Sequence, residues 1–272
     1  MRRVEESCRL ARMYAETASL PGAAGRPNED WSATVVPTWG GGGAVVVLDG
    51  VTPPAGEDGC VHGVPWFTAR LGGALTELCS ARADLTLAEI LADAIRRTAD
   101  IHRSTCDLSH VRTPQATVVL ARWDARCVEH LVLSDSVLLL ESPTGRVRAV
   151  RDDRLDRVPR EVLRSHEATD RYRNAEGGFF TAAADPSVAR RAVTGVSPRQ
   201  EVRALAALTD GASRWVELFG EGDWQDCLRL LRKEGTRGLL DRVRARELHD
   251  ASAGGSRRWK LHDDATAVFA EL

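Results

Sequence analysis

Acidic residues stand at the tips of the apolar runs in this 272-residue sequence. Each tip alone is typical of a turn, because Asp, Asn and Gly are turn formers. If one fold gathered them all, the carboxylates would repel one another and raise each other's pKa. Oxygen donors without histidine or cysteine suit Mg²⁺ or Mn²⁺, so the pattern indicates a site for hard cations. Five tips carry the acids: Asn28-Glu29-Asp30, Asp49-Gly50, Asp135, Asp210-Gly211 and Asp263-Asp264.

The segments that carry these acids are predicted to be strands. Residues 8–22 partly alternate and end in Pro-Gly, which indicates a first strand. The runs DWSATVVPTW and AVVVLDG flank glycines 40–43, which predict a hairpin turn. Further β-rich runs are QATVVLARWD, RCVEHLVLSD, SVLLLES, GRVRAVRD, VRALAALTDG and, at the end of the chain, Ala265–Glu271.

Longer periodic segments predict helices. Two of them cover 61–82 and 85–105, and Thr86 with Glu89 forms a plausible capping box at the start of the second. A third helical region covers 217–249, with a break near Gly235. Strands in runs and helices in pairs favour antiparallel sheets and an α+β fold over a βαβ array. Without repeats, low-complexity linkers or a composition break, residues 1–272 are interpreted as a single domain.

Composition and charge limit the classes of partner that this protein is expected to bind. The net charge of −2 provides no overall field to attract nucleic acid or an acidic membrane. No apolar run approaches the ~20 residues that span a bilayer, and the acids among the first twenty residues argue against a signal peptide. We therefore expect a cytoplasmic protein that binds neither nucleic acid nor membrane.

Cysteine and histidine show no local metal-binding pattern. The six cysteines are scattered without a CxxC motif, which predicts buried free thiols in a reducing compartment. The seven histidines form no HExxH or HxH pair. Local spacing therefore does not predict a zinc site.

The motifs NED, LDG, a TVV strand, SDS, LTDG and DDAT follow one another between Gly25 and Val268. In order and approximate spacing, this set resembles the metal-dependent serine/threonine protein phosphatases of the 2C type (the PPM superfamily), and most of all their divergent bacterial members. The resemblance implies a four-layer α-β-β-α sandwich of two antiparallel sheets flanked by helix pairs, which agrees with the element order. It also implies a phosphorylated protein substrate and two Mg²⁺ or Mn²⁺ ions as cofactors.

Carried over by position, the resemblance gives each acid a role. Asp49 would bridge the two metal ions and Glu29 with the Gly50 carbonyl would complete one site, with Asp30 beside them. Two such ions lower the pKa of a shared water, which then attacks the phosphorus, so that no nucleophilic side chain is needed.

The remaining acids would serve the other metal ions. Asp210 and Asp263 would hold the first site, and together with Asp49 they are the expected catalytic residues. Asp135 lies where the family has the aspartate of its GDS motif, which helps to bind a third, weaker ion. Asp264 occupies the position where the family usually has Asn.

The sequence departs from the family pattern beside these acids. The loop Val51-Thr52-Pro53-Pro54 follows Asp49-Gly50 where the family has His or Met and then Gly-Gly. The histidine proposed as proton donor in animal members is therefore replaced, leaving a metal-bound water or His62 as candidates. Arg26, the candidate substrate-binding arginine, lies three residues before Glu29 instead of four. Further on, Pro114–Thr117 replaces the GTT strand start, and Ser134 replaces the Gly of GDS.

Two local motifs match known functional signatures only in part. Asp49-Gly50-Val51-Thr52 superficially matches the DxDGT signature of aspartate-nucleophile phosphatases, but the required nucleophile position holds Val47. The glycines at 40–43 precede a strand and lack a following Gly-Lys-Ser/Thr, so they do not predict a phosphate loop.

The charged segment at about 152–185 coincides with the flap of bacterial members, although a plain surface helix is an alternative interpretation.

Two functional classes remain open. The first functional class is an active protein phosphatase. The second is a pseudophosphatase, a partner-binding module with little or no turnover, which the altered loop 51–54 and the displaced Arg26 would suit.

Overall fold

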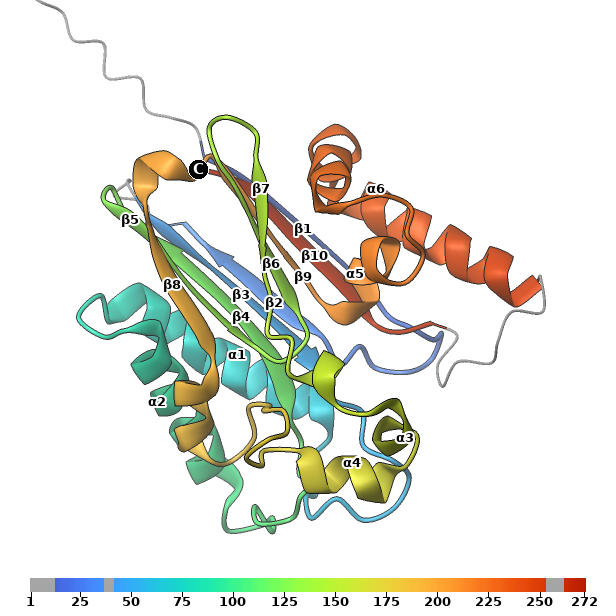
Figure 1. The fold of residues 1–272 in the computed structure, drawn as a ribbon. Helices are drawn as coiled ribbons and strands as arrows, with labels where there is room; N and C mark the ends of the chain where they lie inside the picture. The colour runs from blue at the N-terminus through green and yellow to red at the C-terminus, as the bar shows by residue number, and fades with distance from the viewer. Residues whose placement is uncertain (1–12, 37–41, 253–261) are drawn as a thin grey trace, which may run out of the picture.

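The computed structural model describes residues 13–36, 42–252 and 262–272. The fold is built on two five-stranded antiparallel sheets (Figure 1). One sheet has the order β2-β3-β4-β5-β8 and the other β1-β10-β9-β6-β7. The strands are β1 (Tyr14–Leu20), β2 (Trp31–Val35), β3 (Gly43–Gly50), β4 (Ala116–Trp123), β5 (Cys127–Leu133), β6 (Val137–Glu141), β7 (Val147–Val150), β8 (Val193–Pro198), β9 (Ala204–Leu208) and β10 (Ala265–Glu271).

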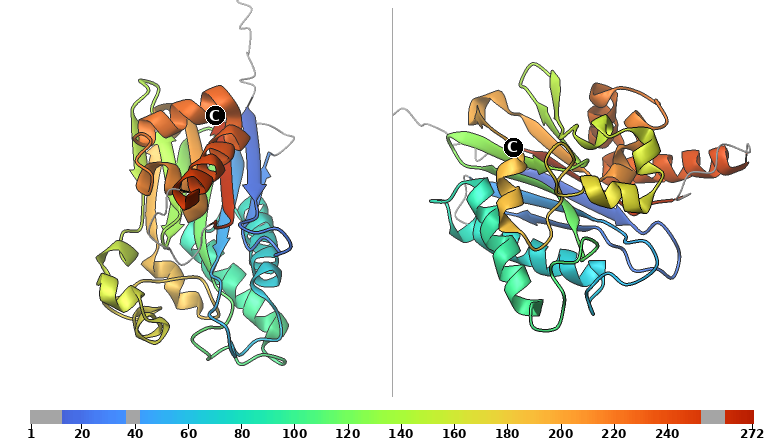
Figure 2. Two further views of the ribbon diagram at one scale, coloured as in Figure 1. Left: turned by 90° about the vertical axis from the view of Figure 1, so that its right-hand side faces the viewer. Right: turned by 60° about the horizontal axis from the view of Figure 1, so that its bottom comes forward.

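Helix pairs cover the outer face of each sheet. Helices α1 (Val64–Ala81) and α2 (Leu87–His102) pack on the sheet that contains β3. Helices α5 (Asp210–Glu217) and α6 (Trp224–Ser252) pack on the sheet that contains β10. The two views in Figure 2 show the resulting α-β-β-α layers, which confirms the fold class expected from the sequence.

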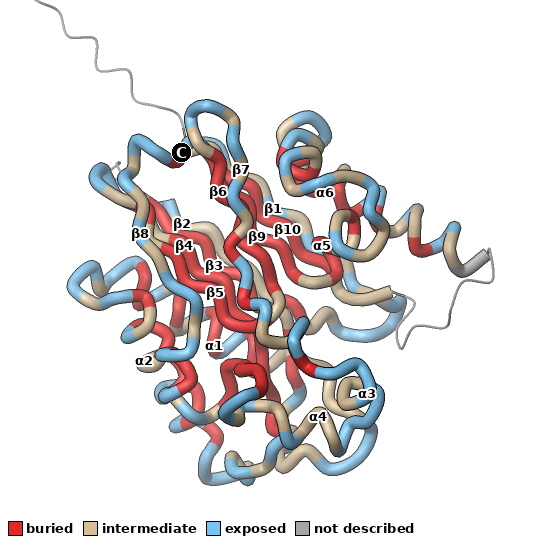
Figure 3. The backbone as a smooth tube through the Cα atoms, viewed as in Figure 1, coloured by how far each residue is buried: buried red, intermediate tan, exposed pale blue. Residues whose placement is uncertain are grey.

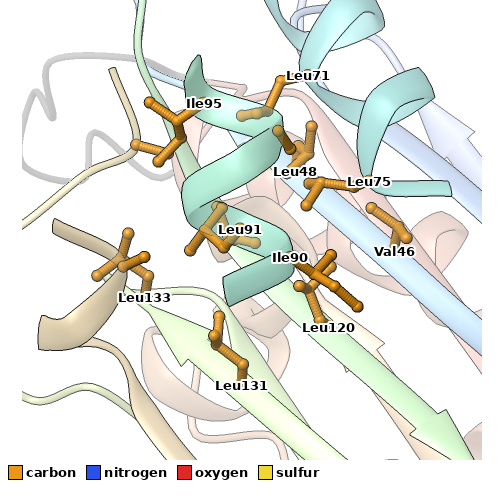
Figure 4. Packing of buried hydrophobic residues seen from close by; sticks show 14 of the residues in the cluster. Val46, Leu48, Leu71, Leu75, Ile90, Leu91, Ile95, Leu120, Leu131 and Leu133 are labelled. Carbon is orange, nitrogen blue, oxygen red and sulfur yellow. The ribbon is translucent and has the colours of Figure 1, made fainter. Parts of the chain in front are cut away.

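Strand β3 illustrates how the core is made. Its residues alternate between two buried faces, so Val46 and Leu48 join the cluster under α1 and α2. Val45 and Val47 join the cluster between the sheets. Figure 4 shows the first cluster at close range, and Figure 3 shows the buried strands in red. Burial on both faces explains the uninterrupted VVVL run, and each such side chain stabilises the fold by roughly 1.5–3 kcal/mol.

Two local sequence signals in the helices are confirmed by the structure. The capping box of α2 is present, with the Thr86 side chain accepting from the Glu89 amide and the Glu89 side chain accepting from the Thr86 amide. Helix α6 is kinked at Gly235, whose φ of 76° is unfavourable for residues with a Cβ. The predicted break near Gly235 is therefore confirmed.

Two elements were not predicted. Strand β8 is an edge strand with a half-exposed VTGVSP sequence, and Gly and Pro are poor strand formers. Helix α5 begins at Asp210, where the sequence indicated only a turn after a strand. The expected hairpin turn at 40–43 and the start of the first predicted strand lie partly outside the described residues.

The charged segment after β7 forms short helical turns. These are η1 (Leu155–Arg157), α3 (Arg160–Leu163) and α4 (His166–Tyr172), and none of them contains a fully buried residue. Figure 1 shows α3 and α4 at the end of the sandwich where the loop after β3 also lies. The chain returns to the sheet through η2 (Pro186–Arg191) and β8, and η3 (Arg199–Glu201) leads into β9. Within the described residues, no helix combines the length and apolarity needed to span a bilayer.

Candidate active site

Strand pairing explains why the acidic tips meet. The start of β2 pairs with the end of β3, at Trp31 and Leu48. In the other sheet, the starts of β6 and β10 both lie beside the end of β9, where Val137 pairs with Leu208. Antiparallel pairing thus brings the N-terminal ends of β2, β6 and β10 to the C-terminal ends of β3 and β9. All five tips lie at that end of the sandwich.

Asp49 lies at the centre of the group. Its Oδ2 accepts a hydrogen bond of 3.2 Å from the backbone N–H of Asp210, which belongs to the other half of the sandwich. Burial raises the pKa of Asp49 well above its ordinary value, and the charges of Asp210, Asp30, Asp135 and Asp263 raise it further. The structure therefore creates the like-charge cluster that the sequence pattern suggested.

Asp30 is the most buried of these acids, with 8% of its surface exposed. Its Oδ2 accepts from Thr209 Oγ1 at 3.0 Å and from Thr266 Oγ1 at 2.7 Å. Its Oδ1 is buried and has no hydrogen-bond partner among the described residues. Burial raises the pKa of Asp30 to about 8, although the two threonine hydrogen bonds oppose the shift. A buried oxygen with free lone pairs is a donor that a cation or an ordered water could use.

Glu29 is positioned by Asp264. The Asp264 carboxylate accepts from the backbone N–H groups of Glu29 and Gly22, each at 2.6 Å. The Glu29 carboxylate accepts from the Thr52 hydroxyl in the loop after β3. Gly50 is required here, because a Cβ would lie 2.5 Å from the Glu29 carbonyl oxygen. Asp264 therefore orients the main chain around Glu29, a role that the sequence did not reveal.

Arginines of α5 and α6 hold Asp263 in place. Arg214, one turn into α5 after Asp210, donates to Asp263 Oδ2 at 3.1 Å and to Glu247 Oε1 at 2.6 Å. Arg244 of α6 donates to the Asp263 carbonyl at 2.6 Å. An arginine beside Asp263 offsets part of the negative charge and fixes its carboxylate. Arg214 would have been found from its i, i+4 spacing to Asp210 if α5 had been predicted.

Asp135 is presented by a strained turn. Ser134 has a φ of 70°, a left-handed conformation that favours glycine. Its backbone N–H donates to Asp152 Oδ2 at 2.9 Å, and its hydroxyl donates to Asp135 Oδ1 at 3.3 Å. The pKa of Asp135 is raised to about 7, mainly by burial and to a smaller extent by the charge of Asp210.

Solved structures with this architecture identify the fold. The chain aligns over 96% of its length with 95% of the serine/threonine phosphatase Stp1 from Staphylococcus aureus, at 16% identity and a TM-score of 0.62. A 2C phosphatase from Toxoplasma gondii aligns with a TM-score of 0.59 at 16% identity, over 94% of each chain. The catalytic domain of the phosphatase PstP, solved with two manganese ions, aligns over 95% of this chain and 97% of its own at 16% identity and a TM-score of 0.57.

The chain has the fold of the 2C-type protein phosphatases. No protein-family model and no curated protein sequence matches it. The likeness at this level of identity is a likeness of fold, and it covers nearly the whole of each chain.

Within this 2C-type fold, Glu29, Asp263 and Asp264 line an open cavity of about 490 Å³. Arg26 is exposed and lines it together with Glu29 and Asp263. The structure thus brings Arg26 to the rim of the acidic site even though its spacing to Glu29 differs from the family pattern. His62, the other candidate near the reaction, packs instead on Trp66, with ring centroids 3.9 Å apart.

A second arginine beside the site was not predicted from the sequence. Arg173 follows α4 and lines a small cavity with the loop 51–54 and Asp170. Burial lowers the pKa of Arg173, while the nearby charges of Asp170 and Asp135 oppose that shift. Arg112 pairs with Asp170 at 2.8 Å and fixes α4 against the loop before β4. The charged segment therefore contacts the edge of the site, which a plain surface helix need not do.

Proposed function

We propose that this chain is a Mg²⁺- or Mn²⁺-dependent phosphatase that hydrolyses phosphoserine and phosphothreonine monoesters on proteins. The observation that carries the proposal is the contact of Asp49 with Asp210 across the two sheets, at the centre of five convergent acidic tips. Carboxylates gathered this closely are costly without a counter-charge, so their retention at one site favours cation binding. The fold shared with serine/threonine phosphatases supports the same conclusion.

The donor set fits hard divalent cations. It contains oxygen atoms alone, as such cations prefer, and the buried Asp30 Oδ1 has no hydrogen-bond partner among the residues described. Asp49 would bridge two ions, with Glu29 and the Gly50 carbonyl completing one site. Asp210 and Asp263 would complete the other, with Asp30 beside the pair and Asp135 available to a third ion. When bound, the ions would acidify a water nucleophile and offset the charge on the phosphoryl oxygens.

The protein's own groups then have defined tasks. Arg214 orients the Asp263 carboxylate through its 3.1 Å hydrogen bond. Asp264 fixes the Glu29 main chain, and the αL turn at Ser134 directs Asp135. Arg26 at the cavity rim is placed to hold the phosphate of an incoming substrate.

The central experiment measures hydrolysis of p-nitrophenyl phosphate and of a phosphothreonine peptide with Mn²⁺, with Mg²⁺ and with EDTA. We expect turnover with either cation and its loss in EDTA. Undiminished turnover in EDTA, after exhaustive dialysis against chelator, would eliminate the cation-dependent mechanism.

A partner-binding module without turnover is the second candidate. The contact between Thr52 and Glu29 favours it, because the hydroxyl already occupies a carboxylate oxygen expected to face a cation. This candidate predicts no hydrolysis and no binding of Mn²⁺ or Mg²⁺ at millimolar concentration. Isothermal titration calorimetry therefore separates the two candidates even if the chosen phosphopeptide is a poor substrate.

A further inference from the structure

A second group of metal-binding side chains lies where the loop after β3 meets the end of α2. The Sγ atoms of Cys60 and Cys106 and a ring nitrogen of His102 all lie within 4.8 Å of one another. Cys60 Sγ is 2.9 Å from Cys106 Sγ and 3.5 Å from His102 Nδ1, and both thiols are free. His102 is 2% exposed, so its ring nitrogen faces this group from the protein interior. Cys60 and Cys106 are thus free thiols, as the sequence predicted, but they are half-buried and lie beside each other.

The distances suit a tetrahedral metal ion after a small adjustment. With a Zn–S bond of about 2.3 Å and a Zn–N bond of about 2.1 Å, tetrahedral ligands lie roughly 3.6 Å apart for S and N. The observed 3.5 Å between Cys60 Sγ and His102 Nδ1 matches this value. Two sulfur ligands would lie roughly 3.8 Å apart, so the thiols must separate by about 1 Å. Cys106 is half-buried in the turn after α2, where a change in χ1 provides that movement.

Backbone amides point at the sulfur atoms. The N–H of His62 donates to Cys60 Sγ at 3.4 Å, and the N–H groups of Val61 and His62 also contact Cys106 Sγ. At Cys106 these donors outweigh burial and lower the pKa of the thiol, whereas burial raises the pKa of Cys60 to about 11. The thiolate is the form that binds metal, so a bound ion would displace the proton of Cys60. The Asp107 N–H donates to the Gly59 carbonyl at 2.7 Å and holds the two loop segments together.

His62 lies beside this group and is the candidate for a fourth ligand. Its ring lies 5.8 Å from the His102 ring, centroid to centroid, and the two planes differ by 18°. Trp66 packs on both rings, at 3.9 Å and 5.1 Å, and covers one side of the group with an apolar surface. The spacing in the chain is Cys60-x-His62 and, from the last residue of α2, His102-x₃-Cys106.

We propose that Cys60, His102 and Cys106 bind one Zn²⁺ ion and that His62 completes a Cys₂His₂ site. Two thiolates and imidazoles select a soft or borderline metal over Mg²⁺ or Mn²⁺, so this ion differs in kind from those expected at the carboxylates. Its role is structural: it ties the loop that leaves Asp49-Gly50 to the end of α2. The inference does not depend on the proposed phosphatase activity.

A disulfide between Cys60 and Cys106 is the competing outcome. A neutral disulfide needs neither a buried imidazole directed at the sulfur atoms nor amide donors that favour thiolates. Both features are present, so zinc is the better account of this group.

The first experiment measures zinc in the full chain, purified under reducing conditions without chelator and supplied with Zn²⁺ during expression. Inductively coupled plasma mass spectrometry should find about one zinc per chain in the wild type. Cys106→Ser and His102→Ala should lose it. Cys127→Ser, which changes a half-buried cysteine at the start of β5, should retain it. Zinc retained in Cys106→Ser would overturn the proposal.

A measurement on the wild type alone covers the case in which the variants fail to fold. Replacement of the metal by Co²⁺ should produce the thiolate-to-metal charge-transfer and intense visible bands of a tetrahedral site with sulfur ligands. His62→Ala should weaken Zn²⁺ binding at least ~10-fold in competition with a chromophoric chelator, and unchanged affinity would remove His62 from the site. A metal-free wild type whose intact mass shows two hydrogens lost, with Cys60 and Cys106 linked in the peptide map, would establish the disulfide and refute the zinc site.

Discussion

The two clusters lie at opposite ends of one loop and have opposite electrostatic character. The carboxylate cluster (Glu29, Asp30, Asp49, Asp135, Asp210 and Asp263) lies where residues 51–63 leave β3, and burial together with like-charge repulsion raises the pKa of Asp30, Asp49 and Asp135. The thiol–imidazole cluster (Cys60, His62, His102 and Cys106) lies where that loop ends. Burial raises the pKa of Cys60 to about 11 and lowers the pKa of His102, so these two groups are neutral without metal. An empty carboxylate cluster is therefore destabilising, whereas an empty thiol–imidazole cluster costs little.

The clusters are also assembled differently. The carboxylates are held by strand ends from both sheets, so their positions follow from register across the whole fold. The thiols and imidazoles are held by one loop and one helix end, so their geometry depends on local packing. A cation at the first cluster relieves repulsion between existing elements, while an ion at the second ties the loop at Cys60 to the end of α2.

The largest effect is expected at the carboxylate cluster. Asp49→Asn should reduce Mn²⁺-dependent hydrolysis of p-nitrophenyl phosphate by at least ~10³-fold, because a bridging ligand is lost while the fold persists. Asp153→Asn, at an exposed acid paired with Arg157, should leave the rate unchanged. Comparable rates for Asp49→Asn and wild type would show that Asp49 has no part in the reaction.

A melting experiment should separate the two metal classes. Mn²⁺ at 100 times its Kd should stabilise the wild type by about 2.7 kcal/mol, and Cys106→Ser equally, but Asp49→Asn much less. A zinc-selective chelator should lower the melting temperature of the wild type and Asp49→Asn, but not of Cys106→Ser. If one substitution abolished both responses, the clusters would not be independent.

Without any cation, Asp49→Asn should melt above the wild type, because it removes one charge from a repelling group. Differential scanning calorimetry in EDTA checks this outcome. A lower melting temperature would show that the Asp210 amide contact outweighs the repulsion.

A smaller effect is expected from Arg26→Ala. Removal of a cation at the cavity rim should raise KM more than it lowers kcat, because the phosphate is bound less tightly in the ground state as well. Arg190→Ala, which removes an exposed arginine on η2, is the matched control. Steady-state kinetics that match the wild type would leave Arg173 as the better candidate for phosphate binding.

The smallest effect concerns Ser134. Ser134→Gly should stabilise the protein by about 1 kcal/mol, since glycine adopts the φ of 70° without strain. Ser134→Ala keeps the strain and loses the hydroxyl bond to Asp135, so it should not stabilise. Chemical denaturation compares the two variants, and equal stabilities would show that the turn is not strained.

Some features of this protein could be predicted from local sequence alone. The VVVL run, the alternating strands and the Thr86–Glu89 capping box specify their elements through short-range periodicity and hydrogen bonding, and they form as predicted. The acidic tips could be picked out because they share one local pattern, and the resemblance to the 2C-type phosphatases implied that they converge. The order of those elements predicted antiparallel sheets in an α+β fold, the resemblance to the 2C-type phosphatases implied the four layers, and the structure confirms both.

Other features depend on contacts between distant residues. The role of Asp264 arises from amides more than 230 positions away, and strand β8 forms because β5 offers it an open edge. Cys60 and Cys106 lie 46 positions apart and carry no spacing signal. Local propensity determines which elements form, because it acts within a few residues. Only tertiary packing determines which side chains then meet, since it joins loops that have no sequence pattern in common.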